Sequence, residues 1–102
     1  MKNVKARIRW LPPEEGGRAT PPVGPVYSTA AKFKQLAARW PQEAWSVVIE
    51  FIDPPDMEGR MTVGIRMLVE GAPENLLEPG SAFELFEGRH CVAIGEVLRQ
   101  QR

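Results

Sequence analysis

The sequence predicts a small, closed all-β domain with one helical insertion. Apolar residues mostly recur with a period of two, which is typical of strands that bury one face. Ten prolines and nine glycines are spread along the 102 residues, as expected for turns between short strands. A helical period occurs once, in residues 29–40. A chain of this length forms one domain, residues 1–102, with a single core.

The first strand is predicted over residues 3–11, where apolar residues and cations alternate strictly. One face therefore packs on the core and the other carries the cations. Pro12 and Pro13 end this strand, because proline cannot donate a hydrogen bond to a strand ladder. The apolar positions are Val4, Ala6, Ile8 and Trp10, and the cations are Lys5, Arg7 and Arg9.

Residues 14–25 are rich in Gly and Pro and lack periodicity, so they are predicted to form a loop. A loop of this length is unusual in a compact domain and indicates a functional role. A short strand over residues 26–28 follows it. Residues 29–40 are then predicted to form an amphipathic helix, because apolar side chains from Phe33 to Trp40 have helical spacing and Pro41 ends the pattern.

The period of two returns in two further strands, residues 44–52 and 61–70. The turn between them, residues 53–59, carries three acids. Ca²⁺ loops need ligands at a defined alternate spacing, which the two prolines of this turn disrupt, so no metal site is predicted. Residues 79–98 predict a hairpin, in which Gly88 provides the turn between two apolar runs.

Charge and composition exclude several classes of function. The 13 basic and 13 acidic residues cancel, which argues against general electrostatic binding of nucleic acid. One cysteine and one histidine exclude an intramolecular disulfide and an all-Cys/His zinc site. His90 and Cys91 are neighbours on a predicted strand, where they point to opposite faces and cannot form a catalytic dyad. The sequence therefore predicts a protein that is not an enzyme and needs no cofactor.

The sequence also contains no motif that predicts nucleotide binding, a membrane span or a signal peptide. No phosphate-binding G-x-x-x-x-G-K-[ST] loop is present, so this chain alone is not expected to bind nucleotide. No apolar run approaches the ~18 residues of a membrane span, and an alternating strand follows the N-terminus without an apolar signal region. We therefore expect a cytoplasmic protein that does not bind membranes.

Two binding hypotheses remain. The first is binding of an unidentified protein by the exposed side of the helix over residues 29–40 and by the long loop. The second is binding of a tRNA or other RNA backbone by the cations of the first strand, by Arg18 and by the turn at Gly88. The ordinary alternative for the cations of the first strand is a solvated face. Residues 99–102 would lie beside these cations if the first and last strands pair.

Three stretches together resemble the C-terminal β-barrel domain of translation elongation factor Tu. They are Glu14 to Pro22, with the run E-E-G-G-R-A-T-P-P, Val63 to Glu70, and Phe83 to Leu98, with Glu-Gly before a Val-x-x-Gly strand. The order and rough spacing match over about residues 4–98, as in a stand-alone homologue of that domain.

The resemblance implies a closed, six-stranded antiparallel barrel of Greek-key type without catalytic residues. It also implies contact with the T-stem backbone of aminoacyl-tRNA, a neighbouring barrel and a nucleotide-exchange factor. Arg18 matches the arginine that contacts tRNA and Gly88 matches the turn glycine near the RNA, although Ala19 stands where the family has histidine. The candidate binding residues are Lys5, Arg7, Arg9, Gly17, Arg18, Thr20, Gly88 and Arg89.

Overall fold

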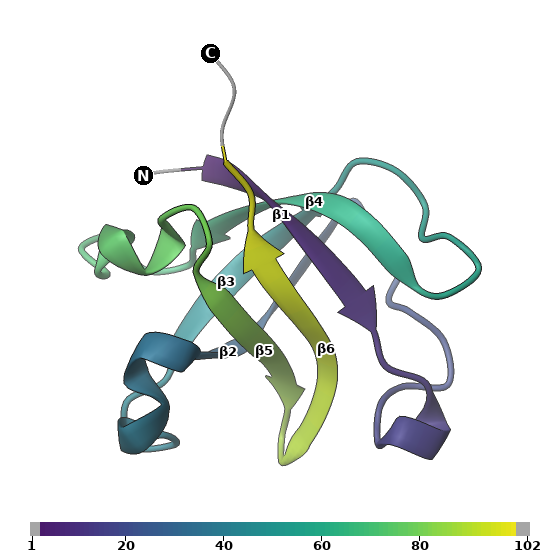
Figure 1. Cartoon of the computed structure of the whole chain (residues 1–102), viewed down its shortest axis with the longest axis horizontal. Coiled ribbons are helices and arrows are strands. Elements are labelled where there is room, and N and C mark those ends of the chain that lie inside the picture. Colours follow the sequence, from purple (N-terminus) through teal and green to yellow (C-terminus); the bar gives the residue numbers. More distant parts are fainter. Residues whose placement is uncertain (1–2, 100–102) are drawn as a thin grey trace.

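The computed structural model describes residues 3–99, which form a closed barrel of six strands (Figure 1). All neighbouring strands are antiparallel, in the order β1-β4-β3-β2-β5-β6, and β6 pairs with β1 to close the ring. The spatial order β1-β4-β3-β2 is a Greek key. The prediction of a closed, six-stranded antiparallel barrel is confirmed. The strands are β1 (Asn3–Trp10), β2 (Val26–Phe33), β3 (Trp45–Phe51), β4 (Arg60–Met67), β5 (Ala82–Glu87) and β6 (His90–Val97).

The alternation of β1 places its side chains as predicted. Val4, Ala6, Ile8 and Trp10 are buried, and the residues between them face outward. β1 pairs with β4 on one side and with β6 on the other. The basic end of the chain cannot be placed beside β1, because residues 100–102 lie outside the described residues.

Two long connections close the ends of the barrel. β1 and β2 lie opposite each other in the ring, so the chain between them crosses one end. β4 and β5 are also opposite, and their connection crosses the other end. This second connection contains the 3-10 helix η3 (Glu74–Leu77), in which Leu76 and Leu77 are buried in the core. The end of the barrel that the second connection crosses is thus filled by Ala72, Leu76 and Leu77.

The predicted helix over residues 29–40 is wrong in its first half. Residues 29–33 belong to β2, which pairs with β3 and with β5. Ala31 and Phe33 are buried while Lys32 between them is partly exposed, so this segment follows the period of a strand. Hydrogen bonding on both sides outweighs the helix propensity of the alanines. Only the 3-10 helix η2 (Lys34–Arg39) remains, and the backbone at Leu36 is non-helical within it.

The strand predicted over residues 61–70 is also too long, because β4 ends at Met67. Its last pairs are Met67 with Val47 of β3 and Arg66 with Asn3 of β1. The first short helix, η1 (Pro13–Glu15), lies in the connection after β1.

Gly95 of β6 is required by close packing inside the barrel. A Cβ atom at this position would lie 2.6 Å from the ring of Phe83 and 2.7 Å from a methyl group of Ile8. Both side chains belong to the buried core and cannot move away freely. We expect Gly95→Ala to lower the free energy of unfolding by roughly 1–3 kcal/mol, measured by urea denaturation.

Gly64→Ala provides the matched control, because Gly64 is also a strand glycine. A Cβ atom there would lie 3.3 Å from the end of the Asn3 side chain and 3.4 Å from Glu50 Cβ. We expect a change within about 0.5 kcal/mol. Equal losses in both variants would show that packing over Gly95 is not special.

Candidate groove on the barrel surface

Strand register brings five outward side chains into one row across the barrel. Arg9 of β1 lies opposite Arg60 of β4 on one side and Ile94 of β6 on the other. Ile94 lies opposite Glu84 of β5, and Glu84 lies opposite Lys32 of β2. These residues are up to 85 positions apart in numbering, from 9 to 94. Cations therefore lie at both ends of the row, with an apolar side chain between them.

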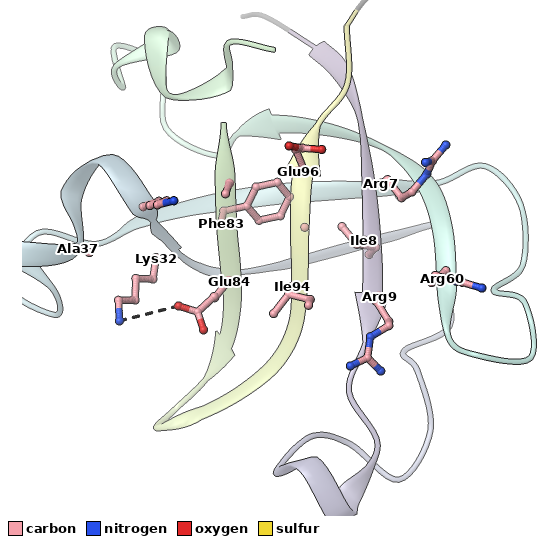
Figure 2. A pocket seen from close by; sticks show the side chains of 13 residues that line it. Arg7, Ile8, Arg9, Lys32, Ala37, Arg60, Phe83, Glu84, Ile94 and Glu96 are labelled. Atoms are coloured by element: carbon pink, nitrogen blue, oxygen red, sulfur yellow. Dashed lines mark ion pairs between the residues drawn. The ribbon is translucent and has the colours of Figure 1, made fainter. Parts of the chain in front are cut away.

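A groove of about 570 Å³ lies over this row on the outer face of β1, β6 and β5. Figure 2 shows Arg7, Arg9 and Arg60 on one side and Lys32 and Ala37 on the other, with Ile94 between them. Ile94 is 41% exposed, a large fraction for an isoleucine. The residues that line the groove are Arg7, Ile8, Arg9, Lys32, Lys34, Ala37, Arg60, Ala82, Phe83, Glu84, Ile94, Gly95 and Glu96.

The groove has an excess of positive charge, with five cations and two carboxylates. Arg9 is 2.8 Å from Glu15, and Lys32 is 3.8 Å from Glu84. Arg60 is paired with Glu58 and with Asp56. Arg7 and Lys34 are in no ion pair with residues 3–99, so their charges are free to bind an anionic group.

A second cluster joins the long loop to the β5–β6 hairpin. Arg18 Nη1 donates to Glu87 Oε2, and the Tyr27 hydroxyl donates to the same oxygen. Arg18 Nε also donates to the carbonyl of Thr20 at 3.0 Å. Close by, the Thr29 hydroxyl donates to the carbonyl of Phe86. These contacts join β2 to β5 beyond residues 30–33 of β2, over which the two strands pair.

The Arg18–Glu87–Tyr27 cluster shifts the pKa values of its members. Burial, followed by the hydrogen bond to Glu87, raises the pKa of Tyr27 to about 12. The hydrogen bond from Tyr27, together with Arg18, lowers the pKa of Glu87 below its ordinary value. At neutral pH the cluster therefore holds a protonated tyrosine, a carboxylate and a guanidinium.

The structure separates the predicted binding residues into three places. Arg7 and Arg9 line the groove, whereas Lys5 lies opposite Gly64 of β4 and does not line it. Gly17, Arg18 and Thr20 line a separate hollow of about 510 Å³ that also contains Glu87 and His90. Gly17 packs closely against Leu11, and a Cβ atom at position 17 would lie 2.0 Å from the carbonyl oxygen of Leu11.

The turn residues Gly88 and Arg89 do not line that hollow, although they adjoin it in sequence. Gly88 has a φ of +61°, a left-handed conformation that suits a tight hairpin turn. Arg89 is exposed at the tip of the turn.

Six charged or exposed groove residues were not among the predicted ones, namely Lys32, Lys34, Arg60, Glu84, Ile94 and Glu96. Ile94 stands between the small residues Ala93 and Gly95 and two positions after Val92, so the period of two alone predicts an inward side chain. The register shift opposite Leu85 and Phe86 places Ile94 on the outer face instead. Its relation to Lys32 and Lys34 depends on pairing between strands that are distant in sequence.

No group of three or more His, Cys, Asp or Glu residues within 3–99 is placed to hold a metal ion. Burial raises the pKa of the Cys91 thiol, and its sulfur lies 3.6 Å from Glu84 Oε2, so the thiol is protonated at neutral pH. Within the same residues, no helix is long and apolar enough to cross a membrane.

Comparisons with known proteins identify no relative for this chain. No model of a protein family matches it, and a search of curated proteins finds no significant match. The groove and the Arg18–Glu87–Tyr27 cluster must therefore be interpreted from their own chemistry.

The single tyrosine allows a direct test of the cluster. Tyr27 has a pKa in the folded protein above its ordinary value of 10.0, so its protonated form stabilises the fold. This contribution is complete below pH 10 and is lost as the pH rises through about 12. We expect tyrosinate absorbance to titrate near 12 in the native protein and near 10 in denaturant.

Glu87→Gln should lower the native titration midpoint of Tyr27 while leaving it above 10.0, because burial is the larger cause of the shift. Glu84→Gln is the matched control, since Glu84 lies on the same strand but pairs with Lys32. Circular dichroism at each pH would show that the barrel is folded. An unchanged midpoint in Glu87→Gln would refute the described hydrogen bond.

Proposed function

We propose that this protein is a non-enzymatic binding module that holds a segment of a partner protein in the groove. The segment has an apolar side chain at its centre and acidic residues on both sides. The observation that carries the proposal is the exposed Ile94 with cations on either side of it, two of which, Arg7 and Lys34, are unpaired within residues 3–99. The proposal includes the cytoplasmic location expected from the sequence.

The chemistry of the groove suits a short peptide segment. Burial of one apolar side chain against Ile94 and Ala82 contributes roughly 1.5–3 kcal/mol. Ion pairs with Arg7 and Lys34 add about 0–1 kcal/mol each, because the sites are open to solvent. We therefore expect weak, reversible binding, with a Kd of roughly 0.2 mM or weaker.

Closure of the barrel favours recognition by side chains. A partner strand can add to a sheet only at a free edge, and ring closure pairs the strands on both sides. An extended segment would instead cross the outward side chains of β5, β6 and β1. The exposed residues of η2, which the sequence assigned to protein binding, form one wall of this path through Lys34 and Ala37.

Binding of an RNA backbone is the second candidate, supported by the resemblance that gives Arg18 and Gly88 this role. The charges argue against it, because Arg18 is already paired with Glu87 and Arg9 with Glu15. Single-stranded RNA also needs exposed aromatic rings for base stacking. The aromatic residue that lines the groove is Phe83, which is 3% exposed. A protein segment therefore fits the groove better.

Arg7→Glu tests the protein-binding proposal. The probe is a synthetic peptide with a Leu-Phe-Leu centre and two glutamates at each end. We expect the peptide to shift the amide resonances of β5, β6 and β1, and Arg7→Glu to weaken binding roughly five- to tenfold, through charge reversal beside the groove. Chemical-shift titration measures both effects.

Arg66→Glu is the matched control, since Arg66 is an outward arginine of β4 that does not line the groove. It should bind the peptide as the wild type does. Equal weakening in both variants, or amide shifts confined to other strands, would contradict the proposed site.

A mobility-shift assay with tRNA over a salt series separates the second candidate. We expect no shift of the tRNA at low salt. A shift that weakens steeply with salt and in Arg18→Ala would establish RNA binding instead. Glu87→Gln sharpens the comparison, because it releases Arg18 from its ion pair and would strengthen any contact that Arg18 makes with phosphate.

A further inference from the structure

The turn between β3 and β4, residues 52–59, presents an exposed apolar side chain among acids. Met57 is 103% exposed and Ile52 is 53% exposed. Asp53, Asp56 and Glu58 lie beside them in the sequence. Figure 1 shows this connection as a loop that extends away from the strands. We call residues 52–59 the acidic turn.

The acidic turn is held in shape by its own hydrogen bonds. Asp56 Oδ1 accepts from the backbone amides of Glu58 and Arg60, both at 2.9 Å. The amide of Gly59 donates to the carbonyl of Asp56 at 3.0 Å, and the amide of Asp56 donates to the carbonyl of Arg60 at 2.9 Å. Because the backbone of the acidic turn is already ordered, the turn loses little conformational entropy when a partner binds Met57.

The acidic turn has the chemistry that the groove accepts. Met57 is the apolar side chain, and methionine adapts its shape to irregular surfaces. Asp53 is in no ion pair with residues 3–99, so its carboxylate is free to pair with a cation of the groove. Arg7 and Lys34 are the matching unpaired cations.

We propose that the acidic turn of one molecule binds in the groove of a second copy of this chain. The inference rests on the proposed function of the groove and names its occupant. Met57 packs against Ile94, and Asp53 pairs with Arg7 or Lys34. The turn does not fill the groove of its own molecule, because Met57 is fully exposed and borders a different hollow, beside Trp10 and Arg18.

Two properties of the chain favour a second copy as the occupant. Each molecule carries both surfaces, so the concentration of turn always equals that of groove. The net charge is zero, so no long-range repulsion separates the copies. Opposite charge on the two surfaces then aligns them at short range.

Sedimentation velocity with two single variants tests this contact. Met57→Lys places a cation where the groove is cationic, and Ile94→Lys does the same to the groove itself. We expect the wild type to self-associate between roughly 0.2 and 2 mM, and each variant to associate at least tenfold more weakly. An equimolar mixture of the two variants should form dimers, because one supplies an intact groove and the other an intact turn.

Val69→Lys is the matched control, since Val69 is 53% exposed in the connection that crosses the other end of the barrel. It should associate as the wild type does. Circular dichroism would show that each variant is folded. A wild type that stays monomeric, variants that associate normally, or a mixture that forms no dimer would each overturn the inference.

The acidic peptide separates this inference from the proposed function. If the wild type is monomeric but binds the peptide through Arg7, the groove is a binding site and the second copy is not its occupant. If the peptide also fails to bind, the proposed function fails as well.

Discussion

Pairing of β1 with both β4 and β6 is the constraint on which the other features of this barrel depend. Closing the ring places strands that are consecutive in sequence, β1 and β2, on opposite sides. The chain must then cross one end of the barrel, and the connection from β4 to β5 must cross the other. The same closure sets β1, β6 and β5 side by side, so residues 7, 84 and 94 contribute to one surface. Neither the two crossing connections nor the groove would exist in an open sheet with the same strands.

Although the net charge is zero, positive and negative charges are concentrated on different parts of the surface. The groove contains five cations from three strands and η2, while the acidic turn contains three carboxylates in seven residues, 53–59. Most of these charges are paired nearby, which limits their attraction for distant polyanions. Of the groove cations and the carboxylates of the acidic turn, Arg7, Lys34 and Asp53 are in no ion pair with residues 3–99. Such an arrangement suits selective recognition of a short segment more than general binding of nucleic acid.

The sequence predicted the elements whose pattern is local. The strict alternation of β1 and the glycine turn at Gly88 are visible within ten residues, and both are confirmed. Residues 29–33 were misassigned because alanines carry little periodic information, and pairing with β3 and β5 decides their conformation. Prediction of the groove was limited in the same way. Arg7 and Arg9 were candidates from their own strand, but Lys32 and Ile94 join them only through the register of distant strands.

The contact between β2 and β5 combines a short backbone ladder with side-chain hydrogen bonds. Over residues 30–33 it is a backbone ladder, whereas beyond them the hydroxyls of Thr29 and Tyr27 and the guanidinium of Arg18 make the contacts. Side-chain contacts can break one at a time without disrupting a ladder, so separation here needs less free energy than elsewhere in the ring. Native-state hydrogen exchange would then show early exchange of the amides in the short ladder between β2 and β5, while the ladder of residues 26–31 with β3 stays closed. The barrel is a continuous ring in its static structure, but its stability is not uniform around that ring.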